Sequence, residues 1–343
     1  MNDNKKCEYK GLRTDLRNII ACPECKSHLV IDEVTVGTNR AIMKGRLICV
    51  KCGQFYPVIK GIPRLLPGRL SLMKKETSES FGYQWQAFSN KINQWENRCR
   101  EYFSPFIPGE IGTGKVLDAG CGYGRWLYEV SDGGGICVGM DLSDAVFAAA
   151  DYFAEKENCH LVQGDILTPP FKQDVFNTVY SIGVLHHLPN GADEGIQSLI
   201  PLVKDQGLFF VWLYGEARGD NKNSLFSFLR KIAKRIPKPV MNIICTLLAG
   251  CVAVIFVFPK RFFALFEATK KVSDQIPFHT YRNLPFNELR TDLFDRYATP
   301  IEYGYNRKEI QNMLTNAGLK DINISALETP RNSKASWRGW GWK

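Results

Sequence analysis

The first ten residues, Met1–Lys10, contain no apolar run of the kind that a secretory signal needs. The sequence also has no low-complexity segment, and its 45% hydrophobic content is enough for a real core, which excludes a disordered chain. Most of its 11 cysteines follow no pairing pattern, so no disulfide framework is indicated. We therefore expect a folded cytoplasmic protein with reduced thiols. The cysteines without a pattern are Cys7, Cys99, Cys121, Cys137, Cys159, Cys245 and Cys251.

Acidic residues are fewer than basic ones, but only moderately, since the net charge is +9. A basic balance of this size fits RNA or anionic lipid, yet the surface lysines of many enzymes produce the same value. The charge therefore selects no partner. The length of 343 residues exceeds that of one typical domain and favours about two.

A glycine-rich turn in the middle of the chain is the strongest local pattern. An apolar run from Lys115 ends at Asp118 and a helical pattern starts at Arg125, which predicts a strand, a tight turn and a helix. Glycine permits positive φ and lets a ligand approach the backbone, while a helix N-terminus favours a carboxylate or phosphate. A nicotinamide-binding turn follows the pattern Gly-x-Gly-x-x-Gly, and it is disfavoured because the third glycine here comes one residue early. The glycines are Gly120, Gly122 and Gly124.

Three further strand patterns follow, and two of them end in an acid. Ile136–Asp141 predicts a second strand whose terminal carboxylate could accept hydrogen bonds from ribose hydroxyls. Cys159–Asp165 predicts a third strand, whose acid could hold an adenine ring. Asn177–Pro189 predicts a fourth strand that continues into a loop with His186 and His187.

This order of motifs resembles the class I S-adenosylmethionine-dependent methyltransferases, particularly their small-molecule branch, from roughly Phe81 to Leu213. The resemblance implies an α/β fold with a Rossmann-like seven-stranded sheet, and S-adenosylmethionine as cofactor. It implies that Asp118 and the glycine turn hold the methionine moiety and that Asp141 binds the ribose. Asp165 and Ile166 would bind the adenine. The expected cofactor-binding residues are Asp118, Gly120, Gly122, Gly124, Asp141, Leu142, Asp165, Ile166, Ser181, Tyr83 and Trp85.

Two of these residues, Tyr83 and Trp85, belong to a segment before the first strand that folds over the cofactor in related enzymes. The alternative is that these aromatic side chains only fasten a helix to the core.

The loop after the fourth strand places His186 and His187 at the sheet edge where substrates meet the cofactor in open α/β folds. Either imidazole could act as a general base on a hydroxyl or amine, whereas in the family it resembles this segment commonly anchors the loop. No catalytic residue is therefore assigned. The Asn-Pro-Pro-Tyr motif of many N-methyltransferases is absent, since Ser181-Ile-Gly-Val stands there, and no cysteine nucleophile is recognisable. We expect an O or N acceptor on a small-molecule, glycan or lipid-linked substrate.

Two Cys-x-x-Cys pairs near the N-terminus are separated by 23 residues and consist of Cys22, Cys25, Cys49 and Cys52. Four thiolates at this spacing suit a structural, tetrahedral zinc ion. Disulfides are disfavoured by the compartment, and a redox motif by the duplicated pair. From Leu16 to Pro67 the pattern resembles the small zinc-ribbon family of tRNA-methyltransferase activator subunits. Its members share both pairs and a Tyr-Pro-Ile-x-x-Gly-Ile-Pro tail, which here begins at Tyr56.

An apolar insertion follows the fifth predicted strand, Leu208–Leu213. Residues 239–259 contain no charge and match a bilayer span by length. One crossing would place strands of the same sheet on opposite sides of a membrane, so the insertion is expected to be a buried lid, a monotopic hairpin or an in-plane helix. Peripheral membrane contact would involve residues 225–266, which include the basic residues Arg230, Lys231, Lys234, Arg235 and Lys238.

We therefore expect six segments: an N-terminal tail (1–15), a zinc ribbon (16–68), a linker with N-terminal helices (69–108), a methyltransferase core (109–215), an apolar helical cap insertion (216–295), and the C-terminal helix and strands of the core (296–343). The expected location is the cytoplasm, including the inner membrane face. The main alternative is an RNA methyltransferase that uses the ribbon for RNA or partner binding. A non-catalytic cofactor-binding adaptor is a further alternative.

Overall fold

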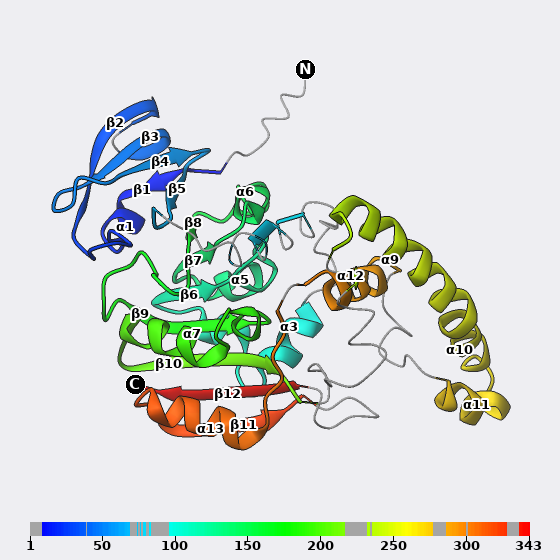
Figure 1. Ribbon diagram of the computed structural model, residues 1–343. Helices are drawn as coiled ribbons and strands as arrows, with labels where there is room; N and C mark the ends of the chain where they lie inside the picture. The colour runs from blue at the N-terminus through cyan, green and yellow to red at the C-terminus, as the bar shows by residue number, and fades with distance from the viewer. Residues whose placement is uncertain are drawn as a thin grey trace.

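One continuous sheet runs through the computed structural model, with helices on both of its faces (Figure 1). The structure describes residues 9–38, 40–68, 74, 76, 78–79, 82–83, 96–216, 232–233, 235–276, 286–299, 301–327 and 336–343. The strand order is β1-β3-β4-β5-β8-β7-β6-β9-β10-β12-β11, with β2 paired to β3. The strands are β1 (Leu12–Arg13), β2 (Leu29–Gly37), β3 (Ala41–Cys49), β4 (Phe55–Ile59), β5 (Ile62–Leu65), β6 (Lys115–Ala119), β7 (Ile136–Asp141), β8 (Cys159–Gly164), β9 (Phe176–Ile182), β10 (Val203–Tyr214), β11 (Lys320–Ala326) and β12 (Ser336–Trp342).

The seven strands from β8 to β11 form the Rossmann-like sheet that the sequence predicts. β8, β7, β6, β9 and β10 are parallel, and β12 runs antiparallel between β10 and β11. Neighbouring residues of one strand belong to hydrophobic clusters on opposite faces, as Val116 and Leu117 of β6 show. Burial of both faces explains why these strands are continuous apolar runs in the sequence.

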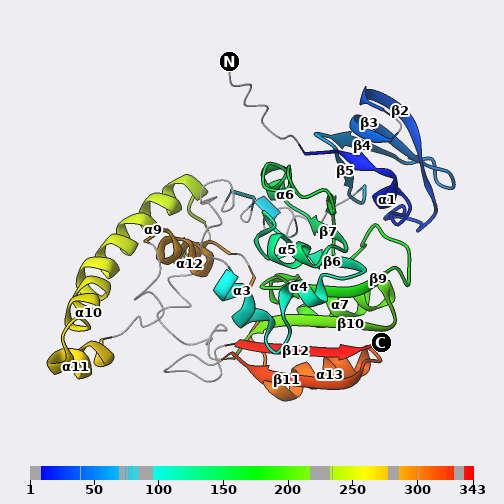
Figure 2. The same cartoon turned by 180° about the vertical axis from the view of Figure 1, so that it is seen from behind.

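Helices from different parts of the chain cover the two faces (Figures 1 and 2). One face carries α7 (Ala192–Leu199) and α13 (Arg307–Asn316), and the other carries α3 (Glu96–Phe103), α5 (Arg125–Val130) and α6 (Ala145–Ala149). The short helices are α1 (Thr14–Arg17), α4 (Pro108–Ile111) and the 3-10 turns η1 (Ser131–Gly133), η2 (Leu185–His187), η3 (Ile200–Leu202) and η5 (Glu267–Thr269).

The N-terminal ribbon, β1 to β5, continues the core sheet at its outer edge. Arg64 and Leu65 of β5 pair in parallel with Gln163 and Gly164 of β8. Nearer the start of β8, the Leu161 amide donates to the Tyr9 hydroxyl at 2.9 Å. Further contacts reach the loop after β8, where the Ala21 amide donates to the Pro170 carbonyl at 2.9 Å. The ribbon is thus joined to the core by backbone pairing as well as by side chains.

The insertion after β10 contains one long helix made of α9 (Lys238–Val252), the π-helical turn η4 (Ala253–Val257) and α10 (Phe258–Phe263). Its 26 residues are long and apolar enough to cross a membrane, by length and composition alone. The π-helical turn lies just before Pro259, which has no N–H to donate within the helix. After α11 (Lys270–Gln275), α12 (Phe286–Ala298) packs along α9.

The predicted helical insertion is confirmed. The helix is not, however, a lid that is buried against the core. Ile243, Leu247 and Val254 are more than 60% exposed, and in Figures 1 and 2 α9 and α10 project from the side of the molecule opposite the ribbon. β10, before the insertion, pairs with β12, after it. This pairing supports the expectation that one chain crossing of a membrane would be incompatible with the sheet.

Candidate functional site

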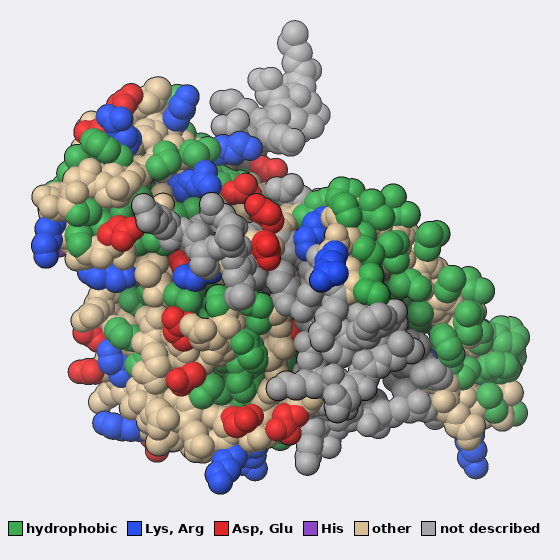
Figure 3. Space-filling model, in the orientation of Figure 1, with side chains coloured by type: hydrophobic (Ala, Val, Ile, Leu, Met, Phe, Trp, Pro, Cys, Tyr) green, Lys and Arg blue, Asp and Glu red, His purple; other side chains and the backbone are tan. Residues whose placement is uncertain are grey.

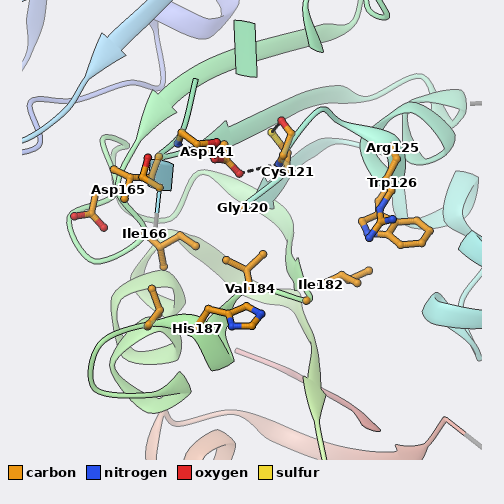
Figure 4. Close-up of a pocket in the computed structure, with 16 residues that line it drawn as sticks. Gly120, Cys121, Arg125, Trp126, Asp141, Asp165, Ile166, Ile182, Val184 and His187 are labelled. Atoms are coloured by element: carbon orange, nitrogen blue, oxygen red, sulfur yellow. Dashed lines mark hydrogen bonds between the residues drawn. The ribbon is translucent and has the colours of Figure 1, made fainter. Parts of the chain in front are cut away.

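A cavity lies at the carboxyl ends of β6, β7, β8 and β9, where ligands bind in open α/β sheets (Figure 4). Asp165 and Ile166 lie at one end of it, Arg125 and Trp126 at the other, and His187 lies on the side opposite Asp141. The described residues that line it are Ser78, Gly120, Cys121, Gly122, Arg125, Trp126, Asp141, Leu142, Ser143, Asp165, Ile166, Ile182, Gly183, Val184, His187 and Leu188.

The glycine turn forms one wall of the cavity and needs glycine for its backbone. Gly120, Gly122 and Gly124 have φ values of 90°, 56° and 87°, a region that other residues rarely adopt. A Cβ atom on Gly120 would lie 2.6 Å from the Val184 side chain, and one on Gly124 would lie 2.4 Å from the ring of Phe153. The turn is therefore closely packed between Phe153, which follows α6, and Val184 in the loop after β9.

Asp118 is the penultimate residue of β6, just before this turn, and is 1% exposed. Neither of its carboxylate oxygens makes a hydrogen bond within the described chain. Burial is the main reason that the pKa of Asp118 rises to about 8; the Asp141 carboxylate raises it further, against the opposing effects of the Tyr180 hydroxyl and Arg125. A buried carboxyl group with unused acceptor capacity favours a cationic ligand group beside it.

Asp141 ends β7 and connects it to the glycine turn. Its Oδ2 accepts a hydrogen bond from the Gly122 amide at 2.8 Å, and its Oδ1 accepts from the Ser143 amide at 2.8 Å and the Ser143 hydroxyl at 2.6 Å. These bonds fix the orientation of the carboxylate toward the cavity. Because each carboxylate oxygen has about two acceptor sites, Oδ2 retains the capacity to accept from a ligand hydroxyl.

Asp165 follows β8 and is held by a cation that the sequence analysis did not predict. Its Oδ1 accepts from the Leu167 amide at 2.9 Å, and its Oδ2 pairs with the Lys74 ammonium at 2.6 Å. Asp165 is 2% exposed, whereas the Lys74 side chain is 19% exposed. An adenine amino group at this end would share Asp165 with Lys74.

His187 and His186 are both buried, but only His187 is among the described residues that line the cavity. His187 lines the cavity, and its Nδ1 lies 2.6 Å from the Ile301 carbonyl oxygen. A carbonyl only accepts, so Nδ1 carries the proton of the neutral ring and Nε2 is the basic nitrogen. His186 is fully buried and stacks on Tyr214 with ring centroids 3.9 Å apart. Of the two, His187 is therefore the candidate general base, and His186 has the loop-anchoring position.

Among the described residues, four expected cofactor residues are absent from the cavity lining: Asp118, Gly124, Ser181 and Tyr83. The Ser181 hydroxyl donates to the Ala119 carbonyl at 2.7 Å and is absent from the cavity lining, while its neighbour Ile182 lines the cavity. Tyr83 stacks on Phe294 of α12 and its hydroxyl accepts from Asn242 of α9 at 3.3 Å, so it contacts the insertion. Trp85 lies outside the described residues.

Arg125, Ser143 and Val184 line the cavity, although the sequence analysis did not single them out as ligand contacts. Each lies one or two residues after a predicted element: the glycine turn, the acid of β7 and the end of β9. Position next to these motifs was thus the signal that could have identified them.

The four cysteines of the ribbon converge as the sequence predicts. The four Sγ atoms lie within 4.8 Å of one another, and the Cys22–Cys52 and Cys25–Cys49 sulfur pairs are 3.7 Å and 3.4 Å apart. A tetrahedron with zinc–sulfur bonds of about 2.3 Å has sulfurs roughly 3.8 Å apart, so the group fits zinc. Lys26 and Gly53, with φ values of 59° and 71°, close the two turns, and the Tyr56 hydroxyl lies 3.1 Å from the Cys22 sulfur.

Two family models match parts of this chain. Residues 116–207 match a family model described as a methyltransferase domain, and residues 13–61 match the Trm112p-like protein family. A sterol 24-C-methyltransferase of Gibberella zeae is 33% identical over 141 residues, which cover 39% of this chain and 36% of that protein. A tRNA U34 carboxymethyltransferase of Psychromonas ingrahamii is 38% identical over 94 residues, 26% of this chain and 28% of that protein. The chain thus spans well under half the length of these relatives.

Among solved structures, human N-acetylserotonin methyltransferase aligns with a TM-score of 0.44 at 14% identity, over 77% of this chain and 57% of that one. A complex that contains the Haloferax volcanii Trm112 methyltransferase activator aligns with a TM-score of 0.44 at 12% identity, over 77% of this chain and 97% of that one.

The sheet order, the glycine turn and the family match together define a class I methyltransferase domain. In this chain that domain is joined, within one polypeptide, to a Trm112p-like domain whose cysteine cluster fits a zinc ribbon.

Proposed function

We propose that the protein is an S-adenosylmethionine-dependent methyltransferase that acts on an oxygen or nitrogen atom of a small, lipid-linked or glycan acceptor. The observation that carries this proposal is the grouping of Asp118, Asp141 and Asp165, each within one residue of the carboxyl end of one of three adjacent strands, near the glycine turn. When bound, the cofactor supplies an electrophilic methyl group on a sulfonium centre.

The residues of the chain fit such a cofactor along the whole cavity. Asp118, which is buried next to the glycine turn, would hold the ammonium group, and Arg125, which lines the cavity, would bind the carboxylate. Asp141 would accept from the ribose, and Asp165 with Ile166 would enclose the adenine. Apolar side chains such as Ile182 and Val184 exclude water from the region between these ends.

On the acceptor side, the basic Nε2 of His187 would take up the proton that a hydroxyl or ammonium group loses during methyl transfer. The apolar lining around His187 and the sterol-methyltransferase relatives favour an apolar or lipid-linked acceptor over a charged one. We further propose structural zinc at the four cysteines and a cytoplasmic location that includes the membrane surface.

Calorimetric titration with S-adenosylmethionine and S-adenosylhomocysteine tests the cofactor. We expect one site per chain, and Asp141→Ala should weaken binding by ~1–3 kcal/mol because it removes charge-assisted hydrogen bonds. Asp205→Ala, an exposed acid on β10, is the matched control and should leave binding unchanged. Binding of NADH without binding of S-adenosylmethionine would refute the proposal.

RNA is the second candidate acceptor, because the Trm112p-like ribbon and a relative named as a tRNA U34 carboxymethyltransferase both point toward tRNA. Labelled-methyl transfer to total lipid, small-molecule and tRNA fractions separates the classes. Turnover on tRNA with a steep salt dependence would favour RNA. Cofactor binding without turnover on any fraction would favour a non-catalytic adaptor.

A further inference from the structure

The long helix α9–η4–α10 presents a continuous apolar surface to solvent, which we term the outer face. It consists of Val240, Ile243, Leu247, Val254, Phe258 and Phe262, at spacings that keep them on one side of a helix, together with Leu265 just after the end of α10. Leu247 is 66% exposed and Leu265 is 76% exposed. Figure 3 shows this surface as an extended hydrophobic area on the side of the molecule away from the ribbon. A soluble monomer rarely exposes an apolar surface of this extent.

The opposite side of the same helix is already occupied. Met241, Cys245, Ala249, Ala253 and Val257 recur every four residues and are buried. They pack against Leu289, Leu293 and Phe294 of α12. Within the described part of this helix, the buried stripe is covered by α12, whereas the outer face is exposed and open to something outside the chain.

The helix that covers the inner side decides how the outer face can meet a membrane. The sequence of α12 includes five charged residues: Glu288, Arg290, Asp292, Asp295 and Arg296. Carrying them into hydrocarbon would be opposed by roughly 2.5–3.5 kcal/mol for each Arg or Asp near the bilayer centre. Together with the pairing of β10 and β12, this excludes a spanning helix and leaves one that lies in the membrane plane with α12 on the aqueous side.

The charges around the outer face are arranged as a bilayer surface requires. Residues 239–259 carry no charge, residues 230–238 carry five basic and no acidic side chains, and residues 260–275 carry four basic and two acidic ones. Among the described residues, Arg235 is exposed at one end, and Arg261 and Lys271 at the other. If two copies paired through this face, net positive ends would meet whether the two helices ran parallel or antiparallel. Anionic headgroups, in contrast, complement both ends.

Lys260 shows how the far end tolerates a charge inside the helix. Its side chain is 1% exposed, and its ammonium donates to the carbonyl oxygens of Ser273 at 2.7 Å and Ile276 at 3.0 Å. The Ser273 hydroxyl donates back to the Lys260 carbonyl at 2.9 Å. These bonds fold α11 against α10 and leave Phe262, Leu265 and Phe266 exposed at the tip.

We propose that the outer face docks in the plane of an anionic lipid bilayer, with its apolar side chains at the headgroup–acyl boundary and Arg235, Arg261 and Lys271 among the headgroups. This surface is separate from the cofactor cavity, since no described residue of the insertion lines that cavity. The proposal therefore stands or falls independently of the methyl-transfer reaction.

Flotation of the full-length protein with vesicles tests the proposal. Vesicles of phosphatidylcholine, with and without phosphatidylglycerol, are compared at low and high salt. We expect binding to the anionic vesicles that high salt weakens. The triple substitution Leu247→Gln, Val254→Gln, Phe262→Gln should reduce binding at least tenfold at both salts. The matched control Val36→Gln, Val50→Gln, Ile107→Gln removes exposed apolar side chains elsewhere and should bind like the unmodified protein.

A second variant isolates the charges. Arg235→Gln, Arg261→Gln, Lys271→Gln should lower affinity by roughly fivefold per charge at low salt and flatten the salt dependence. Calorimetry with S-adenosylhomocysteine should give the same affinity for every variant, which shows that each is folded.

Failure of the unmodified protein to float with vesicles at any salt would overturn the proposal, and so would an equal loss of binding in the matched control. Resistance of the membrane-bound protein to alkaline carbonate extraction would also overturn it, because such resistance indicates a spanning helix. A concentration-dependent dimer in sedimentation that the outer-face variant abolishes, without vesicle binding, would assign the face to a second copy instead.

Discussion

Replacing Gly120 by alanine tests whether the backbone of the glycine turn builds the cavity. Two separate penalties are expected. The residue sits at φ +90°, which costs a residue with a Cβ atom ~1–2 kcal/mol. The new Cβ atom would also lie 2.6 Å from two methyl carbons of Val184, and overpacking of this kind costs a further ~1–3 kcal/mol. Because Val184 lines the cavity, relief of the overlap would push its side chain into the space for the ligand.

Two further variants separate these penalties. Gly134→Ala has φ +75° and nothing within 4 Å of the new atom, so it should cost only the backbone term. Val184→Ala in the Gly120→Ala background removes the colliding methyl groups, so the double variant should recover ~1–3 kcal/mol relative to the sum of the single variants. The observables are the urea unfolding midpoint and the calorimetric affinity for S-adenosylhomocysteine. Equal losses for Gly120→Ala and Gly134→Ala, with no recovery in the double variant, would refute the reasoning.

Three other perturbations have defined outcomes. Cys22→Ser should release the zinc measured by elemental analysis and unfold the ribbon locally while cofactor binding persists, because metal binding and ribbon folding share one free energy; a fully folded ribbon without zinc contradicts this. Burial lowers the pKa of His160 below its usual value, against the hydrogen bond that its Nε2 donates to the Asp15 carboxylate, so the unfolded chain binds more protons and stability should fall as pH decreases below about 6.5. His160→Gln should flatten that decline in urea unfolding between pH 7 and pH 5, and an unchanged slope contradicts the assignment. His187→Gln should lower kcat with little change in cofactor affinity; loss of cofactor binding instead would indicate a structural role.

The sequence predicts those parts of the site that depend on position along a strand. Asp141 and Asp165 follow apolar runs, and because parallel strands end at one edge of the sheet, both reach the same cavity. Ser181 shows the limit, since side chains alternate across a strand and a shift of one residue decides which face is reached. Ile182 lines the cavity, and Ser181 is turned to Ala119.

Contacts between distant segments could not be predicted in this way. Lys74 meets Asp165 across 91 positions, and Tyr83 is oriented by α9 and α12, which follow it by more than 150 residues. The apolar composition of residues 239–259 predicted a long helix, but composition does not say whether another element covers it. Only the position of α12 shows that one stripe is buried and the other exposed.

The pairing of β5 with β8 has a consequence for assembly. A sheet edge with unpaired backbone groups invites an added strand, and here the chain supplies its own through Arg64 and Leu65. Because the ribbon is tethered, its local concentration at that edge is fixed by the chain and does not depend on how much of either partner a cell makes. A separate ribbon protein would have to displace β5 before it could add a strand there. In the fusion, association of the ribbon with the methyltransferase domain is intramolecular instead of bimolecular. The ratio of ribbon to methyltransferase domain is therefore always one to one.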